Sequence, residues 1–333
     1  MELQVQVFSR NDALPDMAGS SFFHSTELFQ VIKATPGHQP LMAVAFDKEN
    51  RVVAHLLACI RRRGSWVPPY LFTQGRIYGE GDYDEKLSSA ERDEAFGLLL
   101  EAITRKFQRH LCLYAEFSNV SHKMFGYRHF REQGYFPVSW QEVHNSLQGM
   151  PPEERIDARL LKMVKRCTAT KAEGGQGVTT RRITDIGECK AFYKQLRSFY
   201  QSKPRNFIPP YRMFAEFIGS SHARYYQTEH NGKSIGCCVC VYSNNNAYLW
   251  FMASKRKTHT RQHPDAVVLW HAIEQAYRDG CDRFYFMDAG LPFPRSKFRE
   301  FILQFGGKPV TKYRWFRCSI SCVNRLLSWL CRE

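Results

Sequence analysis

The residues best suited to chemistry gather at the end of one apolar segment, residues 282–290. This segment predicts a strand that ends near Asp288 and Gly290, and three basic residues follow it, Arg295, Lys297 and Arg299. Formation of an amide from an activated ester needs a base for the acceptor amine and a donor for the developing oxyanion. Asp288 could orient or deprotonate the amine, a basic side chain could serve the oxyanion, and Gly290 would allow close approach of a substrate.

Each of these residues also has a purely structural interpretation. Asp288 could cap the turn after the strand, and Lys297 and Arg299 could lie on the solvent-facing side of a short helix. The sequence holds no G-x-S-x-G motif, and no Cys or His has a recognisable catalytic partner. Direct transfer without a covalent intermediate is therefore the simpler prediction.

Cysteine and histidine patterns do not predict a metal site. Strand alternation places Cys238 and Cys240 on one face of their segment and Cys237 on the other, with no CxxC pair or nearby His to complete a tetrahedral site. His259 and His263 have the spacing of two ligands on a helix, but their segment is typical of a loop. We expect the three cysteines to be small buried hydrophobic residues.

The charge of the chain favours a polyanionic partner. The 333 residues carry a formal net charge of +15, which suits nucleic acid, a phosphorylated cofactor or an anionic membrane surface. The alternative is a basic surface that only keeps the protein soluble. The residues predicted to bind the donor or a polyanion lie on one predicted helix and one later loop, and they are Lys162, Lys165, Arg166, Lys255, Arg256, Lys257 and Arg261. For the helix, an outward-facing basic surface is as good an interpretation as contact with an RNA backbone.

Composition excludes several classes of protein. Hydrophobic residues make up 44% of the chain and aromatic residues 14%, which excludes disorder as the main state. No segment approaches the run of about 18 apolar residues that spans a membrane, and the first residues show no signal peptide. The odd number of 11 cysteines predicts reduced thiols. We expect a cytoplasmic protein without a transmembrane segment, with peripheral contact at the inner face of the membrane as an added alternative.

Helices and strands follow the same predicted order in both halves of the chain. Residues 38–60 predict a hairpin, and residues 95–117 predict a long helix followed by an apolar strand. Residues 223–242 and 266–288 repeat this pattern. Pro151 and Pro152 suit the start of a new helix, so we predict an N-terminal domain at residues 1–150 and a C-terminal domain at residues 151–333.

The last predicted helix is amphipathic. Its apolar stripe has helical spacing and consists of Val323, Leu326, Leu327 and Leu330. Docking of this stripe on the second domain is the common outcome for such a helix. The alternative is attachment at a membrane interface, for which Trp329 and the flanking arginines are suited.

Element order and local motifs together resemble the Fem-like family of tandem GNAT-fold transferases, which includes the aminoacyl-tRNA-dependent peptidoglycan bridge enzymes. Residues 20–60 are similar to that family's opening helix and hairpin, and residues 159–183 to its basic helix and Gly-Val strand. Residues 263–290 resemble its Pro-apolar-Trp helix and following strand, and residues 298–310 its closing helix and Phe-Gly-Gly turn. The resemblance covers nearly the whole chain.

This resemblance implies an α/β fold of two tandem GNAT-like domains, each with a mixed, mainly antiparallel central sheet flanked by helices. It implies transfer of an activated acyl or aminoacyl group to an amine acceptor, which could be a cell-wall precursor, a lipid or an amino sugar. The active site would lie in the C-terminal domain, with a substrate cleft that includes Gly290, Arg295, Tyr248 and Trp250. No permanently bound cofactor is expected, and the donor would be a co-substrate, either aminoacyl-tRNA or acyl-CoA.

One loop departs from the usual GNAT pattern. Ordinary GNAT enzymes have an Arg/Gln-x-x-Gly-x-Gly/Ala loop whose backbone N–H groups hold the pyrophosphate of CoA. Here residues 255–265 contain no glycine, and Pro264 has no N–H to donate. The Fem-like branch lacks that loop too, so the departure favours it. Two alternatives stay open: an acyl-CoA-dependent N-acyltransferase with an atypical loop, and a non-enzymatic nucleic-acid-binding protein on a degenerate transferase scaffold.

Overall fold

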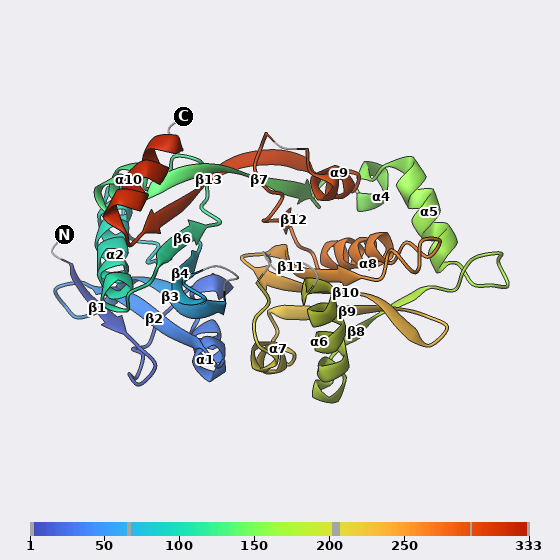
Figure 1. Cartoon of the computed structure of the whole chain (residues 1–333), viewed down its shortest axis with the longest axis horizontal. Coiled ribbons are helices and arrows are strands. Elements are labelled where there is room, and N and C mark those ends of the chain that lie inside the picture. Colours follow the sequence, from blue (N-terminus) through green and yellow to red (C-terminus); the bar gives the residue numbers. More distant parts are fainter. Residues whose placement is uncertain (1–2, 65–67, 202–206, 294, 332–333) are drawn as a thin grey trace. The chain divides into compact units, whose positions relative to one another are not determined.

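The computed structural model describes residues 3–64, 68–201, 207–293 and 295–331. The chain divides into two compact units, Met1–Trp140 with Thr311–Glu333, and Gln141–Val310. It passes from the first unit to the second within strand β7 (Phe136–Ser146) and returns within strand β13 (Lys308–Cys318) (Figure 1). The expected C-terminal domain at residues 151–333 differs from the second unit in its last segment, because β13 pairs with a strand of the first unit, with Trp315 opposite Phe117.

The first unit is a mainly antiparallel sheet with helices packed on it. Its strands, in spatial order, are β1 (Gln4–Phe8), β2 (His38–Phe46), β3 (Val52–Gly64), β4 (Leu71–Tyr78), β6 (Tyr114–Ser118) and β13, and the short β5 (Asp82–Tyr83) pairs with β3. β4 and β6 run parallel. The helices are η1 (Phe22–His24), α1 (Thr26–Ala34), α2 (Ser89–Arg109), α3 (Tyr127–Glu132) and α10 (Ser321–Leu330).

Helix α2 supplies much of the core of the first unit. It begins with a capping box, in which the Ser88 hydroxyl accepts from the Glu91 N–H (3.3 Å) while the Glu91 carboxylate accepts from the Ser88 N–H (2.9 Å). Its apolar side, which includes Phe107, is buried against the sheet. Trp315 of β13 joins this core and stacks on Phe130 of α3, with ring centroids 4.5 Å apart.

The second unit repeats this arrangement. Its strands, in spatial order, are the end of β7, β12 (Arg283–Phe286), β11 (Asn246–Ser254), β10 (Lys233–Ser243), β9 (Ala223–His230) and β8 (Thr179–Ile183). β11 and β12 run parallel. The helices are α4 (Pro152–Arg155), α5 (Ala158–Thr168), α6 (Ile186–Gln201), α7 (Tyr211–Phe217), α8 (Pro264–Arg278) and α9 (Lys297–Leu303).

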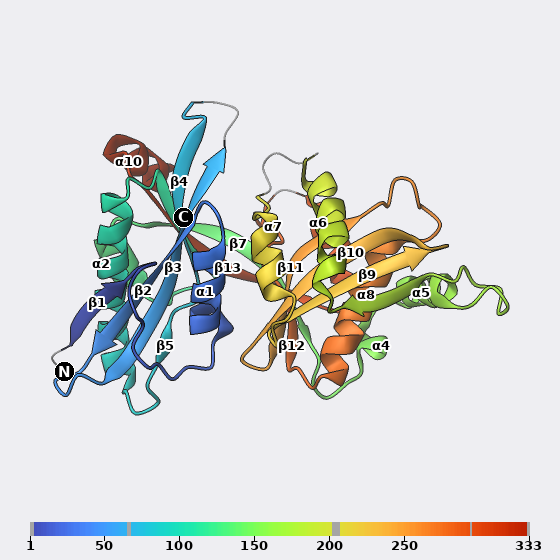
Figure 2. The same ribbon diagram turned by 90° about the horizontal axis from the view of Figure 1, so that it is seen from below.

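Helices α6 and α8 lie on opposite faces of the second sheet (Figures 1 and 2). α8 approaches β10 closely because position 236 is a glycine: a Cβ there would lie 2.9 Å from the Pro264 carbonyl oxygen. Cys238 and Cys240 face the core on the α8 side, and Cys237 is buried as well. The three cysteines are therefore small buried hydrophobic residues, as predicted.

Helix α10 corrects the expectation for the last predicted helix. It lies on the first unit, where the Asn324 side chain accepts from the Cys318 N–H (2.7 Å) and donates to the Gly134 carbonyl (2.9 Å). None of its residues is buried. The prediction that the apolar stripe docks on the second domain is therefore wrong. Asn324 attaches the helix to the first unit, and of the predicted stripe Leu327 is half-buried while Val323, Leu326 and Leu330 are exposed.

Two buried histidines make the first unit sensitive to acid. His24 and His55 are only 1% and 3% exposed. The His24 ring nitrogens lie 3.1 and 2.9 Å from the backbone N–H groups of Leu57 and Gly81. A neutral imidazole accepts from one of these two groups, and a charged imidazole accepts from neither. Burial lowers the pKa of His24 to about 3 and the pKa of His55 to about 4. The unfolded chain, with ordinary histidine pKa values, therefore takes up protons first as the pH falls.

We predict that the free energy of unfolding of the first unit falls by about 2 kcal/mol between pH 7.5 and pH 5. Each histidine contributes to this loss, since its folded pKa lies below its unfolded one. Asp82, whose pKa burial raises to about 6, offsets part of it, because the folded state binds that proton more readily. Urea unfolding at both pH values measures the change. Asp82→Asn should steepen the loss, and equal stability at both pH values would contradict the prediction.

Candidate active site

The paired strands β11 and β12 separate at a defined point. Residues 246–249 pair in parallel with residues 283–286, and the pairing ends at Leu249 and Phe286. The chain after β12 stays with β7 instead, through hydrogen bonds of Gln141 with Gly290 (2.8 Å) and Ala289 (3.0 Å). The sheet therefore opens between β11 and the segment 287–290.

A β-bulge marks the same point on β11. Opposite β10, the register shifts so that Val239 faces Phe251 while Cys240 faces Leu249, which leaves Trp250 as an extra residue. A bulge bends its strand and re-aims the side chains beside it. The bend and the change of partner after β12 together explain why the strands separate here.

A cavity of about 350 Å³ lies where the strands separate. This volume is in the range of small-molecule sites. Its walls come from β11, from the segment after β12, from the end of α6 and from the start of α9. The lining residues are Phe199, Tyr200, Leu249, Trp250, Met252, Phe286, Met287, Asp288, Ala289, Gly290, Ser296 and Phe298.

The lining combines an apolar wall with a few polar groups. Asp288 is exposed, and among the described residues that line the cavity it is the only one with a carboxylate. Tyr200 lies close enough for its ionisation to be opposed by the Asp288 charge, and burial above all raises the pKa of Tyr200 to about 12. The cavity thus contains a carboxylate that can take a proton and a phenol that stays protonated.

Only part of the predicted cleft lines this cavity. Asp288, Gly290 and Trp250 do. Tyr248 is buried and stacks on Tyr285, with ring centroids 4.9 Å apart.

The three basic residues predicted beside Asp288 do not appear among the described lining residues. The Arg299 guanidinium donates to the carbonyl oxygens of Leu291 (2.7 Å) and Pro292 (3.4 Å), so it holds the loop that follows Gly290. Lys297 and Arg295 are exposed.

Sequence reasoning missed the aromatic wall at the end of α6. Phe199 and Tyr200 are far from Asp288 in sequence, and no local pattern joins them to it. The signal in the sequence is an aromatic pair closing an amphipathic helix, which is equally typical of a core. Ser296, which caps α9 by accepting from the Arg299 N–H (3.3 Å), also lines the cavity and was missed.

The two predicted polyanion-binding segments meet within the second unit. On α5, Lys162, Lys165 and Arg166 are exposed on the side away from buried Leu160 and Val164. The end of α5 contacts the loop of residues 255–263, because the Arg261 carbonyl oxygen lies 3.5 Å from Cys167 Sγ and 2.8 Å from Gln176 Nε2. Figure 1 shows α5 beside α8, which this loop precedes.

The basic residues of this loop differ in the contacts that their side chains make. The Lys255 ammonium donates to the Ser234 carbonyl (2.9 Å), and Arg256 pairs with Asp265 (3.2 Å). Lys257 and Arg261 have exposed side chains.

The start of α8 does not fit the pyrophosphate of CoA. His263, the N-cap residue, has φ +41° and makes no side-chain cap. Pro264 lacks an N–H group, and the buried carboxylate of Asp265 occupies the first turn. The Asp265 carboxylate, which pairs with Arg256, thus takes the place at the helix N-terminus where the dipole would favour a phosphate.

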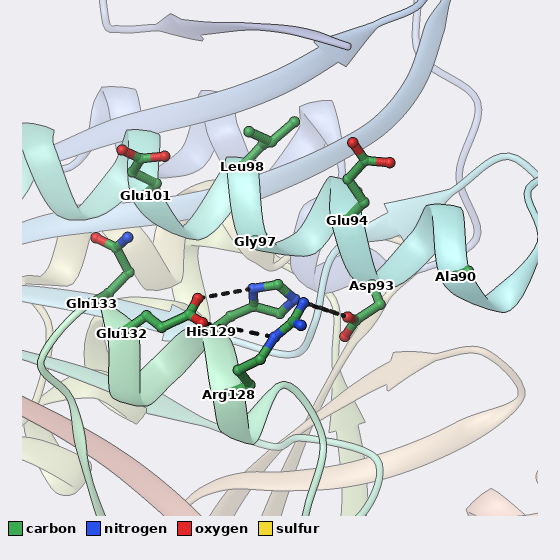
Figure 3. A pocket seen from close by; sticks show the side chains of 10 residues that line it. All are labelled: Ala90, Asp93, Glu94, Gly97, Leu98, Glu101, Arg128, His129, Glu132 and Gln133. Atoms are coloured by element: carbon green, nitrogen blue, oxygen red, sulfur yellow. Dashed lines mark hydrogen bonds and ion pairs between the residues drawn. The ribbon is translucent and has the colours of Figure 1, made fainter. Parts of the chain in front are cut away.

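A second groove, on the first unit, has a different character. It lies between α2 and α3, and Figure 3 shows His129 between Asp93 and Glu132. The His129 Nε2 lies 2.9 Å from the Asp93 carboxylate, and its ring packs on Gly97, where a Cβ would lie 2.6 Å from Nδ1. Arg128 pairs with the same two carboxylates at 3.6 and 3.8 Å. The contacts of Arg128 and His129 with Asp93 attach α3 to α2, and we assign the groove no role in transfer.

Comparison with known proteins places the fold. Residues 158–295 match the family model described as an acetyltransferase (GNAT) domain. The structure of FemX is similar over 93% of this chain and 95% of its own, with TM-score 0.64 and 9% identity. L-PGS from Bacillus licheniformis is similar over 96% of this chain and 100% of its own, with TM-score 0.58 and 11% identity. A tandem GNAT protein from the clavulanic acid biosynthesis pathway is similar over 96% of this chain and 99% of its own, with TM-score 0.55 and 11% identity. No curated protein sequence matches the chain. These likenesses confirm the predicted fold class.

Proposed function

We propose that this chain, a GNAT-superfamily protein with a tandem fold like that of FemX, is an N-acyl or aminoacyl transferase of the Fem-like type. It moves an activated acyl or aminoacyl group onto an amine acceptor. The observation that carries the proposal is the cavity between the separated strands β11 and β12, with Asp288 in its wall. An acyl group and an amine must be held together at one point, where orientation replaces random encounter.

The residues in the cavity suit the steps of direct transfer. Asp288 takes the proton of the acceptor amine as the new C–N bond forms. The backbone N–H of Trp250, the extra residue of the bulge beyond the end of the pairing with β12, donates to the developing oxyanion. Tyr200 keeps its proton at neutral pH, since its pKa is about 12, and returns a proton to the departing oxygen or sulfur.

We further propose aminoacyl-tRNA as the donor. Two observations support it: the unsuitable start of α8 for pyrophosphate, and the exposed basic groups of α5 beside the loop of residues 255–263. Lys and Arg side chains arranged along a surface neutralise phosphates of an RNA backbone and release counterions. The acyl-CoA-dependent alternative needs an anion site that this loop does not offer.

Charge reversal on α5 tests the donor. We predict that Lys165→Glu combined with Arg166→Glu weakens binding of bulk aminoacylated tRNA by about 10-fold or more and flattens its salt dependence. Filter binding across a KCl series measures both effects. Lys190→Glu combined with Lys194→Glu is the matched control, because these exposed lysines of α6 undergo the same change of charge away from α5. Saturable binding of acetyl- or long-chain acyl-CoA, with tRNA binding unaffected by the α5 variant, would reject the aminoacyl donor.

A further inference from the structure

Helix α10 is attached to the first unit by its polar side. Asn324 makes the two hydrogen bonds described above, and the Ser328 hydroxyl accepts from Arg131 at 3.3 Å. Leu327 and Cys331, on the same side, are half-buried. An amphipathic helix of a globular protein ordinarily does the reverse and turns its apolar stripe toward the core.

The opposite side of α10 is apolar and open to solvent. At 3.6 residues per turn, Val323, Leu326, Trp329 and Leu330 lie across the helix from Asn324 and Ser328. The exposed fractions of this outward group, which Ile320 extends at the start of the helix, are Ile320 48%, Val323 36%, Leu326 55%, Trp329 63% and Leu330 61%. Scattered exposed leucines are ordinary, but a stripe along one helix face marks an interaction surface.

A neighbouring loop continues this surface. The Ser319 N–H donates to the Leu113 carbonyl at 2.9 Å, so the start of α10 lies beside the loop that holds Leu111, which is 83% exposed. A cavity of about 600 Å³ is lined by Ser319, Leu111 and Leu71 together. Leu71 is 66% exposed, and its neighbour Tyr70 is 67% exposed. The apolar surface, which we call the α10 surface, therefore consists of the outward residues of α10, Leu111, Tyr70 and Leu71.

The segments that build the α10 surface supply positive charge. Among the described residues of these segments, 61–64, 68–79, 109–113 and 319–331, none is Asp or Glu. They contribute the exposed side chains of Arg62, Arg109 and Arg325. An apolar face with a tryptophan and a basic border matches the boundary between acyl chains and anionic headgroups.

We propose that the first unit binds an anionic bilayer surface through the α10 surface. The outward leucines enter the acyl boundary, Trp329 lies at headgroup level, and the arginines contact lipid phosphates. A second copy of this chain fits less well, because a two-fold contact would place each basic border against itself. None of the described helices is long and apolar enough to cross a bilayer. The proposal holds whether or not the transfer reaction is as proposed above.

Vesicle co-sedimentation tests the proposal. The full chain is mixed with vesicles of phosphatidylcholine alone or with about 30% phosphatidylglycerol, and we expect binding to the anionic vesicles that weakens with salt. Leu326→Ser combined with Leu330→Ser should lower the partition coefficient by about 10-fold or more, because each leucine loses most of its apolar transfer free energy. Ile186→Ser is the matched control, since Ile186 of the second unit is 58% exposed.

The possible results distinguish an anionic bilayer from a second copy of this chain as the partner of the α10 surface. Loss of vesicle binding in the double variant, with the control unchanged and thermal melting preserved in both, supports the proposal. Absence of binding to anionic vesicles, or equal binding by the double variant, overturns it. Concentration-dependent dimers in analytical ultracentrifugation that the double variant abolishes would assign the surface to a second copy and overturn it as well.

Discussion

Replacing Asp288 with asparagine should lower the turnover of acyl transfer by about 100-fold or more while leaving the fold intact. The amide keeps the size of the carboxylate and part of its hydrogen bonding, but it cannot accept the proton of the acceptor amine. Asp288 lies in the wall of the cavity and is exposed, so the substitution leaves the packing of the buried core unchanged. Steady-state kinetics with a fixed donor and a varied amine measures the effect.

Which kinetic parameter changes in the Asp288→Asn variant matters as much as the size of the change. A base acts in the transition state, so kcat should fall while KM for the amine changes little. Glu300→Gln is a suitable control, because Glu300 is an exposed carboxylate of α9 outside the described lining of the cavity. Turnover within about twofold of the unsubstituted chain would remove Asp288 from the mechanism. A rise in KM alone would make it a residue that orients the amine.

Local rules predicted much of the fold and one part of the site. The capping box of Ser88 and Glu91, which starts α2, is a pattern within four residues. Asp288 and Gly290 stand at the end of an apolar run, and an apolar run that stops marks where a strand leaves the core. The position of these residues at the open end of β12 therefore followed from sequence.

The remaining features depend on contacts between distant segments. Nothing near Tyr200 indicates that the end of α6 faces Asp288. The return of residues 311–333 to the first unit depends on the pairing of Trp315 with Phe117, which no local pattern encodes. For α10, the periodicity predicts an amphipathic helix, but periodicity alone does not say which side faces the protein. Asn324 and its partners decide that.

The first unit also contains a buried charge cluster centred on Glu116. Its carboxylate lies 2.6 Å from an Arg76 nitrogen and 3.4 Å from an Arg314 nitrogen, and it accepts from the Gln74 amide at 2.9 Å. Arg76 and Arg314 are 5% and 9% exposed. Arg61 adds a further positive charge nearby, donating to Gln74 at 2.9 Å. The carboxylate therefore holds together a group of arginines in a place with little water.

The pKa of Glu116 reports the balance of these effects. Burial acts to raise the pKa, but the surrounding guanidinium groups of Arg76, Arg314, Arg61 and Arg63 together hold it below its usual value. A carboxyl whose folded pKa is lower than its unfolded one stabilises the fold above the unfolded pKa. That stabilisation is lost as the pH falls through the lowered folded value.

Glu116→Gln should lower the free energy of unfolding of the first unit by about 3–5 kcal/mol at neutral pH. Glutamine keeps the shape but removes the charge, so the buried guanidinium groups repel one another without compensation. Urea unfolding measures the loss. It should shrink as the pH falls from the unfolded pKa of glutamate through the lowered folded pKa, because the unfolded chain takes up the proton first and the folded carboxyl later. Glu101→Gln removes a pair with Arg105 whose side chain is 67% exposed, and should cost less than about 1 kcal/mol. If both variants lose equally little, the arginines are solvated in the folded state, and Glu116 is not what keeps them together.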